Sequence, residues 1–397
     1  MHKQNEYAIR ETEEYFGPLY PYIKNEKITD IDISNGMVFI TDSSNQRTRC
    51  REIRITDEFL EIFVQRVANT VSKSFNKDVP VLEAETDRLR LTIVHPSVSL
   101  GGISVSIRKT PVIQRITEAN IVSSGYMSRE IYELIRALVR AHMNIVFCGE
   151  PGVGKTECAK FFSQYIPKDE RVITIEDNPE WHYSILNPGH DSVELRINDR
   201  MDYTKAIKTC LRLNPKWMML SEARSTEVLR LIEGFSTGVH GMTTLHTDDV
   251  TKIPDRMVNM AGTISNEKRF LNNVYSFIDV GILIRKKMVK DSYGREKKIR
   301  YLDEMCFFLH DETGNRAELC VKNGALTENP IPEEIIRKME RDGLDVAKEI
   351  PFLRKQQPAD DSCCEESSED IRMNEILREI INLSNERRKA VEKKYFI

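Results

Sequence analysis

A glycine-rich run near the middle of the chain constrains the fold more than any other feature of the sequence. The run G-E-P-G-V-G-K-T occupies residues 149–156 and has the spacing G-x-x-x-x-G-K-[ST]. The apolar run N-I-V-F-C precedes it at residues 144–148, and the helix-compatible C-A-K-F-F follows at residues 158–162. A strand, a glycine loop and a helix in this order place backbone N–H groups and the positive helix end around a phosphate. The sequence therefore predicts an α/β fold with a phosphate-binding loop (P-loop).

The chemistry of phosphate binding predicts roles for individual residues of this loop. Lys155 is expected to reach the β and γ phosphates of a nucleotide, and the Thr156 hydroxyl is expected to hold magnesium. ATP and Mg²⁺ are therefore the expected ligands. The predicted nucleotide-binding residues of the loop are Gly149, Glu150, Pro151, Gly152, Val153, Gly154, Lys155, Thr156 and Glu157.

Short apolar runs alternate with helical stretches after the loop. Three of them lie at residues 172–175, 217–220 and 242–245, and strand-like runs follow at residues 277–284 and 301–309. Alternation of this kind is typical of a largely parallel sheet covered by helices.

The chain before residue 110 has a different pattern, which predicts a small α/β domain. Two strands, residues 31–34 and 37–40, flank an Asn-Gly turn, and residues 56–71 carry a helical apolar face. Residues 89–94 and 103–107 alternate as further strands.

These patterns predict the domain organisation. We expect an N-terminal domain at residues 1–110, a linker at 111–125 and the P-loop domain at 126–310. A C-terminal appendage would occupy residues 311–397, with an acidic linker at 356–370 and a charged terminal helix.

Acidic residues follow two of the predicted strands, where ligands gather in an open α/β sheet. Glu176 and Glu222 are expected to orient the attacking water and to support the metal ion, with the division of these roles left open. Arg224, close to Glu222, joins the predicted catalytic residues, and Thr156 and Glu222 are the predicted magnesium ligands. His246 ends another strand, as either a γ-phosphate sensor or a structural hydrogen bonder.

Composition limits the partners and the compartment. With 58 Lys and Arg against 62 Asp and Glu, the net charge of −4 gives no whole-chain attraction to nucleic acid. No apolar run approaches the roughly 20 residues that span a bilayer, and the polar N-terminus has no signal-peptide core. The eight cysteines show no C-x-x-C spacing, which favours reduced thiols in the cytosol. We therefore expect a cytoplasmic protein whose membrane association is peripheral.

Four ordered motifs resemble one known family. They are the Walker A run at residues 149–156, an Asp box at 174–180, a Walker B at 218–224 and a His box ending at His246. The L-R-L-N-P-K run at residues 211–216 resembles the family's lead into Walker B. Over residues 31–310 the chain resembles the secretion and pilus-assembly ATPases of bacterial type II and type IV systems. That superfamily includes the type IV pilus motors, the Tad/Flp pilus motor CpaF and conjugative-transfer ATPases.

The resemblance implies a fold and a function. The fold would be a RecA-like P-loop ATPase core with a smaller, PAS-like α/β N-terminal domain and a helical C-terminal tail. The function would be that of a homohexameric motor that hydrolyses ATP to power pilus assembly or protein secretion. Its partner would be an inner-membrane platform protein, at the cytoplasmic face of the inner or plasma membrane. One alternative is a conjugative DNA-transfer ATPase, and another is a non-hydrolysing, nucleotide-dependent scaffold.

The chain departs from the family pattern at two positions, and it matches the family's basic strands. Ser221 takes the glycine position of Walker B, and Val239 stands where the His box often has its first histidine, so that only His246 is carried over. The resemblance implies that three arginines face nucleotide held by the same or a neighbouring subunit, where a guanidinium can neutralise phosphoryl charge. These arginines are Arg88, Arg90 and Arg108.

Overall fold

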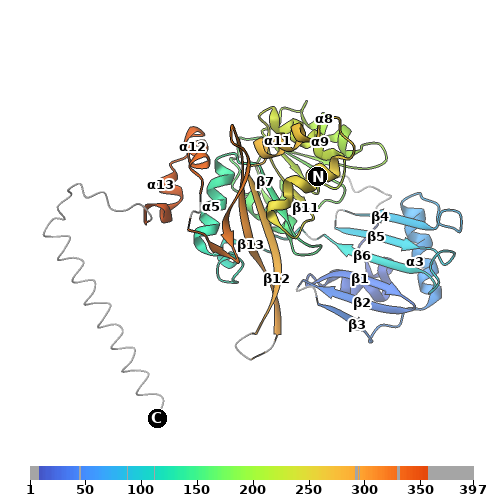
Figure 1. The fold of residues 1–397 in the computed structure, drawn as a ribbon. Coiled ribbons are helices and arrows are strands. Elements are labelled where there is room, and N and C mark those ends of the chain that lie inside the picture. The colour runs from blue at the N-terminus through green and yellow to red at the C-terminus, as the bar shows by residue number, and fades with distance from the viewer. Residues whose placement is uncertain are drawn as a thin grey trace, which may run out of the picture. The chain divides into compact units, whose positions relative to one another are not determined.

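The computed structural model describes residues 9–43, 46–86, 88–110, 112–290, 294, 296–328 and 331–355 (Figure 1). The chain divides into a compact unit, Met1–Ile350, and a second unit, Pro351–Ile397. The acidic linker and the terminal helix predicted from the sequence lie outside the described residues. Within the first unit the strands form two separate sheets.

The first sheet is antiparallel and has the strand order β3-β2-β1-β6-β5-β4. Its strands are β1 (Ile28–Ser34), β2 (Met37–Asp42), β3 (Arg47–Cys50), β4 (Val81–Glu85), β5 (Leu89–Val94) and β6 (Ser104–Lys109). The accompanying helices are α1 (Glu13–Phe16), the 3₁₀ turn η1 (Gly17–Leu19), α2 (Tyr20–Lys24) and α3 (Asp57–Thr70).

Local sequence accounts for this sheet and its main helix. Asn35 and Gly36 both have positive φ, 50° and 67°, the conformation that a tight two-residue hairpin between β1 and β2 requires. The Thr56 side chain accepts the Phe59 N–H at 3.2 Å and so begins α3. The buried face of α3 packs against the sheet in one apolar cluster that includes Phe63. The strands predicted at residues 31–34, 37–40 and 89–94 and the helix over 56–71 are confirmed.

The second sheet has nine strands in the order β15-β14-β13-β12-β7-β11-β10-β8-β9. Its strands are β7 (Ile145–Cys148), β8 (Val172–Glu176), β9 (Ser192–Arg196), β10 (Trp217–Leu220), β11 (His240–Leu245), β12 (Val280–Lys290), β13 (Glu296–Asp311), β14 (Gly314–Lys322) and β15 (Ala325–Leu326). The six strands from β12 to β9 are parallel, and β13, β14 and β15 add antiparallel pairs at one edge. The largely parallel sheet predicted from the alternating pattern is confirmed. The strands β9, β14 and β15 were not predicted.

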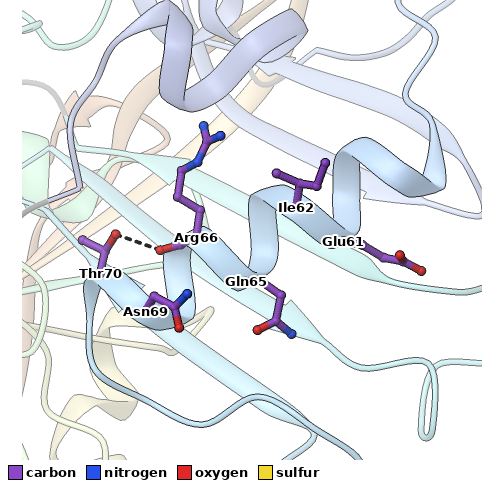
Figure 2. A pocket seen from close by; sticks show the side chains of 6 residues that line it. All are labelled: Glu61, Ile62, Gln65, Arg66, Asn69 and Thr70. Carbon is purple, nitrogen blue, oxygen red and sulfur yellow. Dashed lines mark hydrogen bonds between the residues drawn. The ribbon is translucent and has the colours of Figure 1, made fainter.

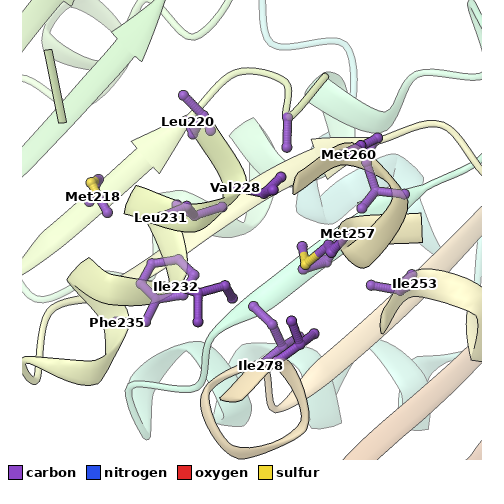
Figure 3. Close-up of a cluster of buried hydrophobic side chains, with 14 of the residues drawn as sticks. Met218, Leu220, Val228, Leu231, Ile232, Phe235, Ile253, Met257, Met260 and Ile278 are labelled. Carbon is purple, nitrogen blue, oxygen red and sulfur yellow. The ribbon is translucent and has the colours of Figure 1, made fainter. Parts of the chain in front are cut away.

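Helices cover this sheet. They are α4 (Glu118–Ile121), α5 (Arg129–Arg140), α6 (Lys155–Ser163), α7 (Tyr183–Leu186), α8 (Tyr203–Cys210), α9 (Glu227–Ser236), α10 (Ile253–Ala261), α11 (Glu267–Phe277), α12 (Glu333–Arg341) and α13 (Val346–Glu349), with the 3₁₀ turn η2 (Val250–Lys252). The 3₁₀ turn η3 (Pro351–Lys355) belongs to the second unit. All four residues of β7 and of β10 are buried, as expected for strands covered on both faces. Figure 3 shows side chains of α9 and α10 packed beside Met218 and Leu220 of β10. Each fully buried leucine or methionine side chain there stabilises the folded state by about 1.5–3 kcal/mol relative to the exposed side chain.

The sheet extends beyond the predicted boundary of the P-loop domain. Residue 310 falls inside β13, and the sheet continues through β14 and β15. The segment predicted as an appendage from residue 311 therefore begins within a strand of this sheet.

Two surface findings bear on function. Among the described residues, no helix is long and apolar enough to cross a membrane. A shallow hollow runs along the outer face of α3 (Figure 2). It is lined by α3 residues from Glu61 to Thr70 and includes no residue of the P-loop, so it is a groove on a helix surface rather than the predicted site.

Candidate nucleotide-binding site

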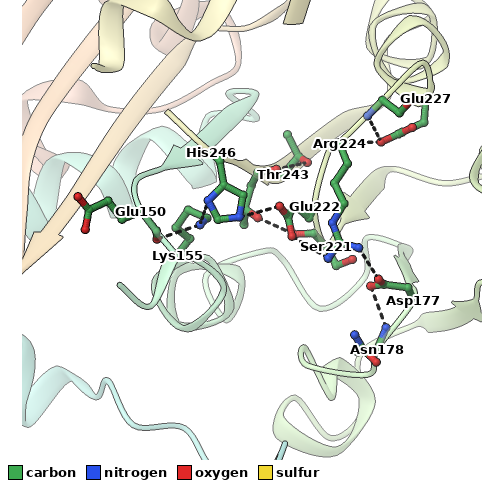
Figure 4. Close-up of polar contacts among 12 residues, drawn as sticks. Glu150, Lys155, Asp177, Asn178, Ser221, Glu222, Arg224, Glu227, Thr243 and His246 are labelled. Atoms are coloured by element: carbon green, nitrogen blue, oxygen red, sulfur yellow. Dashed lines mark hydrogen bonds and ion pairs between the residues drawn. The ribbon is translucent and has the colours of Figure 1, made fainter. Parts of the chain in front are cut away.

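Strand order brings the four motifs to one edge of the sheet. The strands β7, β11, β10 and β8 are neighbours and run parallel, so their carboxyl ends lie together. The P-loop follows β7, and Glu222 follows β10. The strand β11 lies between them and is followed by His246, which therefore falls between Lys155 and Glu222 (Figure 4).

The P-loop backbone needs glycine at its first position. Gly149 has φ of +139°, and a Cβ there would lie 2.4 Å from the Ile284 carbonyl oxygen of the neighbouring strand β12. Gly154, with φ of +91°, adopts the left-handed conformation at the N-cap of α6. The Lys155 amine folds back onto the loop and donates to the carbonyls of Gly149, at 3.1 Å, and Glu150, at 3.2 Å. Lys155 is only 7% exposed, and burial lowers the pKa of its amine to about 8, although Glu222 opposes this shift.

His246 links the lysine to the acid of Walker B. Its Nδ1 lies 3.1 Å from Lys155 Nζ, and its Nε2 lies 2.9 Å from Glu222 Oε1 (Figure 4). Nε2 donates to the carboxylate, because a carboxylate only accepts, whereas Nδ1 faces both the Lys155 amine and, at 3.2 Å, the Gly149 carbonyl oxygen. His246 is therefore a bridge between two charged groups in this arrangement.

The chain of contacts continues to the Asp box. Arg224 donates to Glu222 Oε2 at 2.8 Å and to Asp177 Oδ2 at 2.7 Å. Burial alone would lower the pKa of Arg224, but the ion pairs with Glu222 and Asp177 raise it above its ordinary value. The Arg224 N–H also donates to Glu227 at 2.5 Å, which fixes the start of α9 beside the site. The ion pair with Asp177 was not predicted, because it depends on β8 lying next to β10.

Glu176 occupies a different environment from Glu222. It is 5% exposed, and its Oε2 accepts the N–H groups of Glu180, at 2.7 Å, and Trp181, at 3.0 Å. Burial raises the pKa of Glu176 to about 8, against the effect of these two hydrogen bonds. Its carboxyl group therefore organises the Asp-box loop, and among the described residues no hydrogen bond or ion pair joins it to Lys155 or Glu222.

A second acid of the Asp box approaches the P-loop. Burial raises the pKa of the Glu180 carboxyl, and a hydrogen bond with the Thr156 side chain opposes that shift. Glu180 belonged to the predicted Asp box but not to the predicted catalytic residues. Its place beside the predicted magnesium residue is a finding of the structure.

The two departures from the family pattern occupy distinct places. Ser221 is buried, and its carbonyl accepts the Thr244 hydroxyl at 2.7 Å, which ties β10 to β11. Val239 precedes β11, and His240 begins that strand at the end opposite His246. The His240 ring lies 4.8 Å from the ring of His142, and burial, followed by the charge of His142, lowers its pKa to about 4. His240 thus belongs to a separate cluster.

The three predicted arginines lie on or beside neighbouring strands of the first sheet. Arg90 on β5 and Arg108 on β6 are directly opposite each other, and exposed Arg88 precedes β5. Arg90 pairs with Glu83 at 3.6 Å, and Arg108 pairs with Asp30 at 3.0 Å.

Arg90 also approaches the Asp box. Its Nη1 lies 2.6 Å from the side-chain oxygen of Asn178 when that amide is oriented to satisfy both of its atoms. No hydrogen bond or ion pair joins any of the three arginines to residues 149–156 of the described structure.

The parallel sheet and its glycine loop define the chain as an α/β protein of the P-loop class. The chain belongs to the family described as "Type II/IV secretion system protein", whose model matches residues 80–393. The family resemblance stated from the motifs is thereby confirmed.

Three similar proteins illustrate the family. A Bacillus anthracis protein described as uncharacterised is 29% identical, over 82% of this chain and 75% of its own length. The type IV secretion system protein VirB11 of Brucella suis biovar 1 is 28% identical, over 56% of this chain and 70% of its own length. The X-ray structure of the Yersinia pseudotuberculosis ATPase DotB matches with a TM-score of 0.57 at 13% identity, covering 89% of this chain and 88% of that one. This last likeness supports the fold alone.

Proposed function

We propose that this chain hydrolyses ATP, with Mg²⁺, as the motor of a type II/IV-type secretion or pilus machine. The observation that carries the proposal is the continuous chain of contacts from Lys155 through His246 and Glu222 to Arg224. These contacts connect Lys155, a cation that can bind phosphate, to Glu222, an acid that can orient water. Both lie at the carboxyl ends of the parallel strands, where a P-loop holds nucleotide.

Each residue would have a defined task. Lys155 would bind the β and γ phosphates, and the N–H groups that begin α6 would face the same anion. Thr156 and the adjacent Glu180 provide oxygen atoms of the kind magnesium prefers, so the residues fit the ion. Magnesium bound there would neutralise phosphate charge.

The two predicted acids would divide their roles. Glu222 would orient the attacking water, because its carboxylate lies at the centre of the chain of contacts. Glu176 would hold the Asp-box loop in place, because both of its hydrogen bonds go to backbone N–H groups of that loop.

We infer a homohexamer at the cytoplasmic face of a membrane, docked on a membrane-embedded platform protein, on the basis of family membership. We further propose a domain division at residues 111–125, between the antiparallel and the nine-stranded sheets. Arg90 and Arg108 would then act on nucleotide from the first sheet, which is supported by the approach of Arg90 to the Asp box.

A second candidate function is conjugative DNA transfer. It is favoured by the similarity to the conjugal transfer protein TrbB of Rhizobium radiobacter, which is 25% identical over 54% of this chain and 66% of its own length. Comparing ATP turnover with and without single-stranded DNA would separate the two candidates, since a motor coupled directly to DNA is expected to respond to it. The third candidate, a non-hydrolysing scaffold, is opposed by the uninterrupted contacts between Lys155 and Glu222.

The central test is phosphate release by the purified full-length chain. The wild type should release phosphate from ATP in the presence of Mg²⁺, and Lys155→Ala should lose turnover by at least about 100-fold. The matched control is Lys168→Ala, which removes an exposed lysine from the loop that follows α6. A wild type that binds ATP without releasing phosphate would favour the scaffold.

A further inference from the structure

The hairpin formed by β12 and β13 leaves the sheet beside the P-loop. The strand β12 pairs with β7 only from Val280 to Leu283, and a register irregularity follows between Leu283 and Ile284. From Ile284 to Lys290 it pairs with β13 alone, and the two strands project as a long arm (Figure 1). The lysine and arginine side chains of this arm therefore lie on an extension of β12, the strand that pairs with β7 and so lies beside the P-loop.

Two of these cations face the P-loop. Lys286 on β12 and Arg300 on β13 are directly opposite each other, so their side chains share one face of the hairpin. Lys286 Nζ lies 3.4 Å from the Pro151 carbonyl oxygen, and Arg300 Nη2 lies 3.5 Å from that of Gly152. Lys155 already occupies the two preceding carbonyls, so each of the four carbonyls from residue 149 to residue 152 faces a cation.

Neither hairpin cation forms an ion pair among the described residues. In the described structure no carboxylate lies within 4.0 Å of Lys286 or Arg300, and Arg300 Nε is buried without a hydrogen-bond partner. Burial lowers the pKa of both groups, and the charges of Lys298 and Arg300 lower that of Lys286 further, although the charge of Glu150 raises the pKa of Lys286 and the charges of Glu157 and Asp42 raise that of Arg300. Like charges that face each other across a β-ladder are destabilising, so an anion at this place would relieve the repulsion.

The contacts of Lys286 and Arg300 with the P-loop carbonyl oxygens are long, so other acceptors can replace these oxygens. Distances of 3.4 and 3.5 Å exceed the usual 2.7–3.2 Å of an N–H···O hydrogen bond, so the carbonyls hold these cations weakly. The Arg300 Cδ would lie 3.4 Å from a Cβ on Gly154, at the start of α6. The guanidinium is thus next to the helix end that favours anions, and its fork suits phosphate oxygens. The shorter contact of Arg300 is the donation of Nη1 to the Ser43 carbonyl oxygen at 2.8 Å.

We propose that Lys286 and Arg300 form a second cationic subsite of the nucleotide site, which binds the polyphosphate of ATP and ADP. Without nucleotide they contact the Pro151 and Gly152 carbonyl oxygens, and with nucleotide bound they donate to phosphate oxygens instead. This inference rests on the proposed function, because it requires nucleotide in the P-loop.

The test is equilibrium binding of fluorescent ATP and ADP analogues to the full-length chain. Lys286→Met and Arg300→Gln should each weaken affinity about three- to ten-fold, the range for partly exposed charged contacts. The dissociation constant should also rise less steeply with salt in each variant. Arg300→Lys, which keeps the charge, should recover most of the loss and covers the case in which Arg300→Gln folds poorly. Inorganic pyrophosphate should compete less well with the ADP analogue in both charge-removing variants.

Lys287→Met is the matched control. Lys287 has the same charge on the same hairpin but lies on the opposite face, over the Tyr301 ring at 4.2 Å. Affinity should be unchanged in this variant. Equal losses in Lys287→Met and Lys286→Met, or wild-type affinity in both Lys286→Met and Arg300→Gln, would overturn the inference while leaving the P-loop assignment intact. A wild type that binds no nucleotide would instead overturn the proposed function.

Discussion

Lys155 and His246 share a hydrogen bond of 3.1 Å although 91 residues separate them in the sequence. The contact exists because β11, which His246 follows, is the direct neighbour of β7 in the sheet. The other ring nitrogen of His246 faces Glu222 at 2.9 Å. His246 therefore contacts both Lys155, the predicted phosphate-binding cation, and Glu222, the acid of Walker B. A nucleotide that attracts Lys155 would break the contact between Lys155 and His246.

Replacing His246 tests this bridge. His246→Asn should leave nucleotide affinity within about three-fold of wild type and slow ATP turnover on the order of 10- to 100-fold. The reason is that Glu222 loses the N–H that orients its carboxylate. Binding and turnover are measured on the same preparation. The control is His240→Asn, at the other end of β11. A turnover rate equal to wild type in His246→Asn would show that the bridge is only structural.

The two predicted acids should respond differently to the same substitution. Glu222→Gln should reduce turnover by at least about 100-fold while nucleotide binding persists, because the amide cannot act as a base toward water. Glu176→Gln should retain most turnover, because a neutral side chain with one acceptor oxygen can still cap the Asp-box loop. Steady-state kinetics of both variants give the comparison. The reverse order of effects would return the water-orienting role to Glu176.

The pKa of Glu176 makes a prediction about stability and pH. Its folded-state pKa of about 8 lies above the ordinary value of 4.5 for a glutamate, so the folded state binds more protons between these pH values. The free energy of unfolding should therefore fall as pH rises from about 4.5 to about 8 through this group. Glu176→Gln should lack this component, and its melting temperature relative to wild type should rise across that window. Parallel melting curves for the two proteins would contradict the assignment.

Much of the fold follows from local patterns. The Asn35-Gly36 turn, the apolar runs of β7 and β10, and the glycine loop before α6 are each encoded by neighbouring residues, so the sequence was sufficient to predict them. The edge strand β9 was missed because two of its five residues are charged and none is fully buried. The usual apolar run of a parallel strand is absent there.

The candidate site was predictable as a set of residues but not as an arrangement. The sequence indicated Lys155, Glu222 and His246, yet which of them touch depends on strand order, and no local pattern encodes that order. The contact of Asp177 with Arg224 and that of Glu180 with Thr156 were missed for the same reason. Likewise, the different surroundings of Glu176 and Glu222 became distinguishable only through burial and hydrogen bonding.

The lowered pKa of Lys155 predicts how nucleotide affinity varies with pH. The amine must be protonated to attract phosphate, and its pKa of about 8 lies below the ordinary value of 10.5 for a lysine. Affinity for ADP should therefore be constant below pH 8 and weaken above it, by at most about ten-fold per pH unit. Glu222 holds the proton on Lys155, so in Glu222→Gln the decline should begin at lower pH. An affinity that stays constant up to pH 10 would contradict this reading of the lysine.

The last prediction concerns the helices that follow the sheet. Glu349 of α13 has a side chain that is 12% exposed and pairs with Arg136, at 3.2 Å, and Arg140, at 2.5 Å, on α5. The helix α5 leads into β7 and the P-loop, so these ion pairs tie residues 331–350 to the helix that precedes the nucleotide site. Glu349→Gln should lower the free energy of unfolding by about 1–3 kcal/mol, because the largely buried Glu349 carboxylate loses its ion pairs with two guanidinium groups.

Glu333→Gln is the matched control for Glu349→Gln. Glu333 also pairs with an arginine, Arg337, but its side chain is 74% exposed, and such surface pairs contribute roughly 0–1 kcal/mol. Urea denaturation of both variants, with the unfolding slope checked against wild type, gives the difference. If the two substitutions had equal, small effects, α13 would not be anchored through Glu349. In that case the apolar contacts of buried Val346 and Ile350 would have to hold the segment against α5.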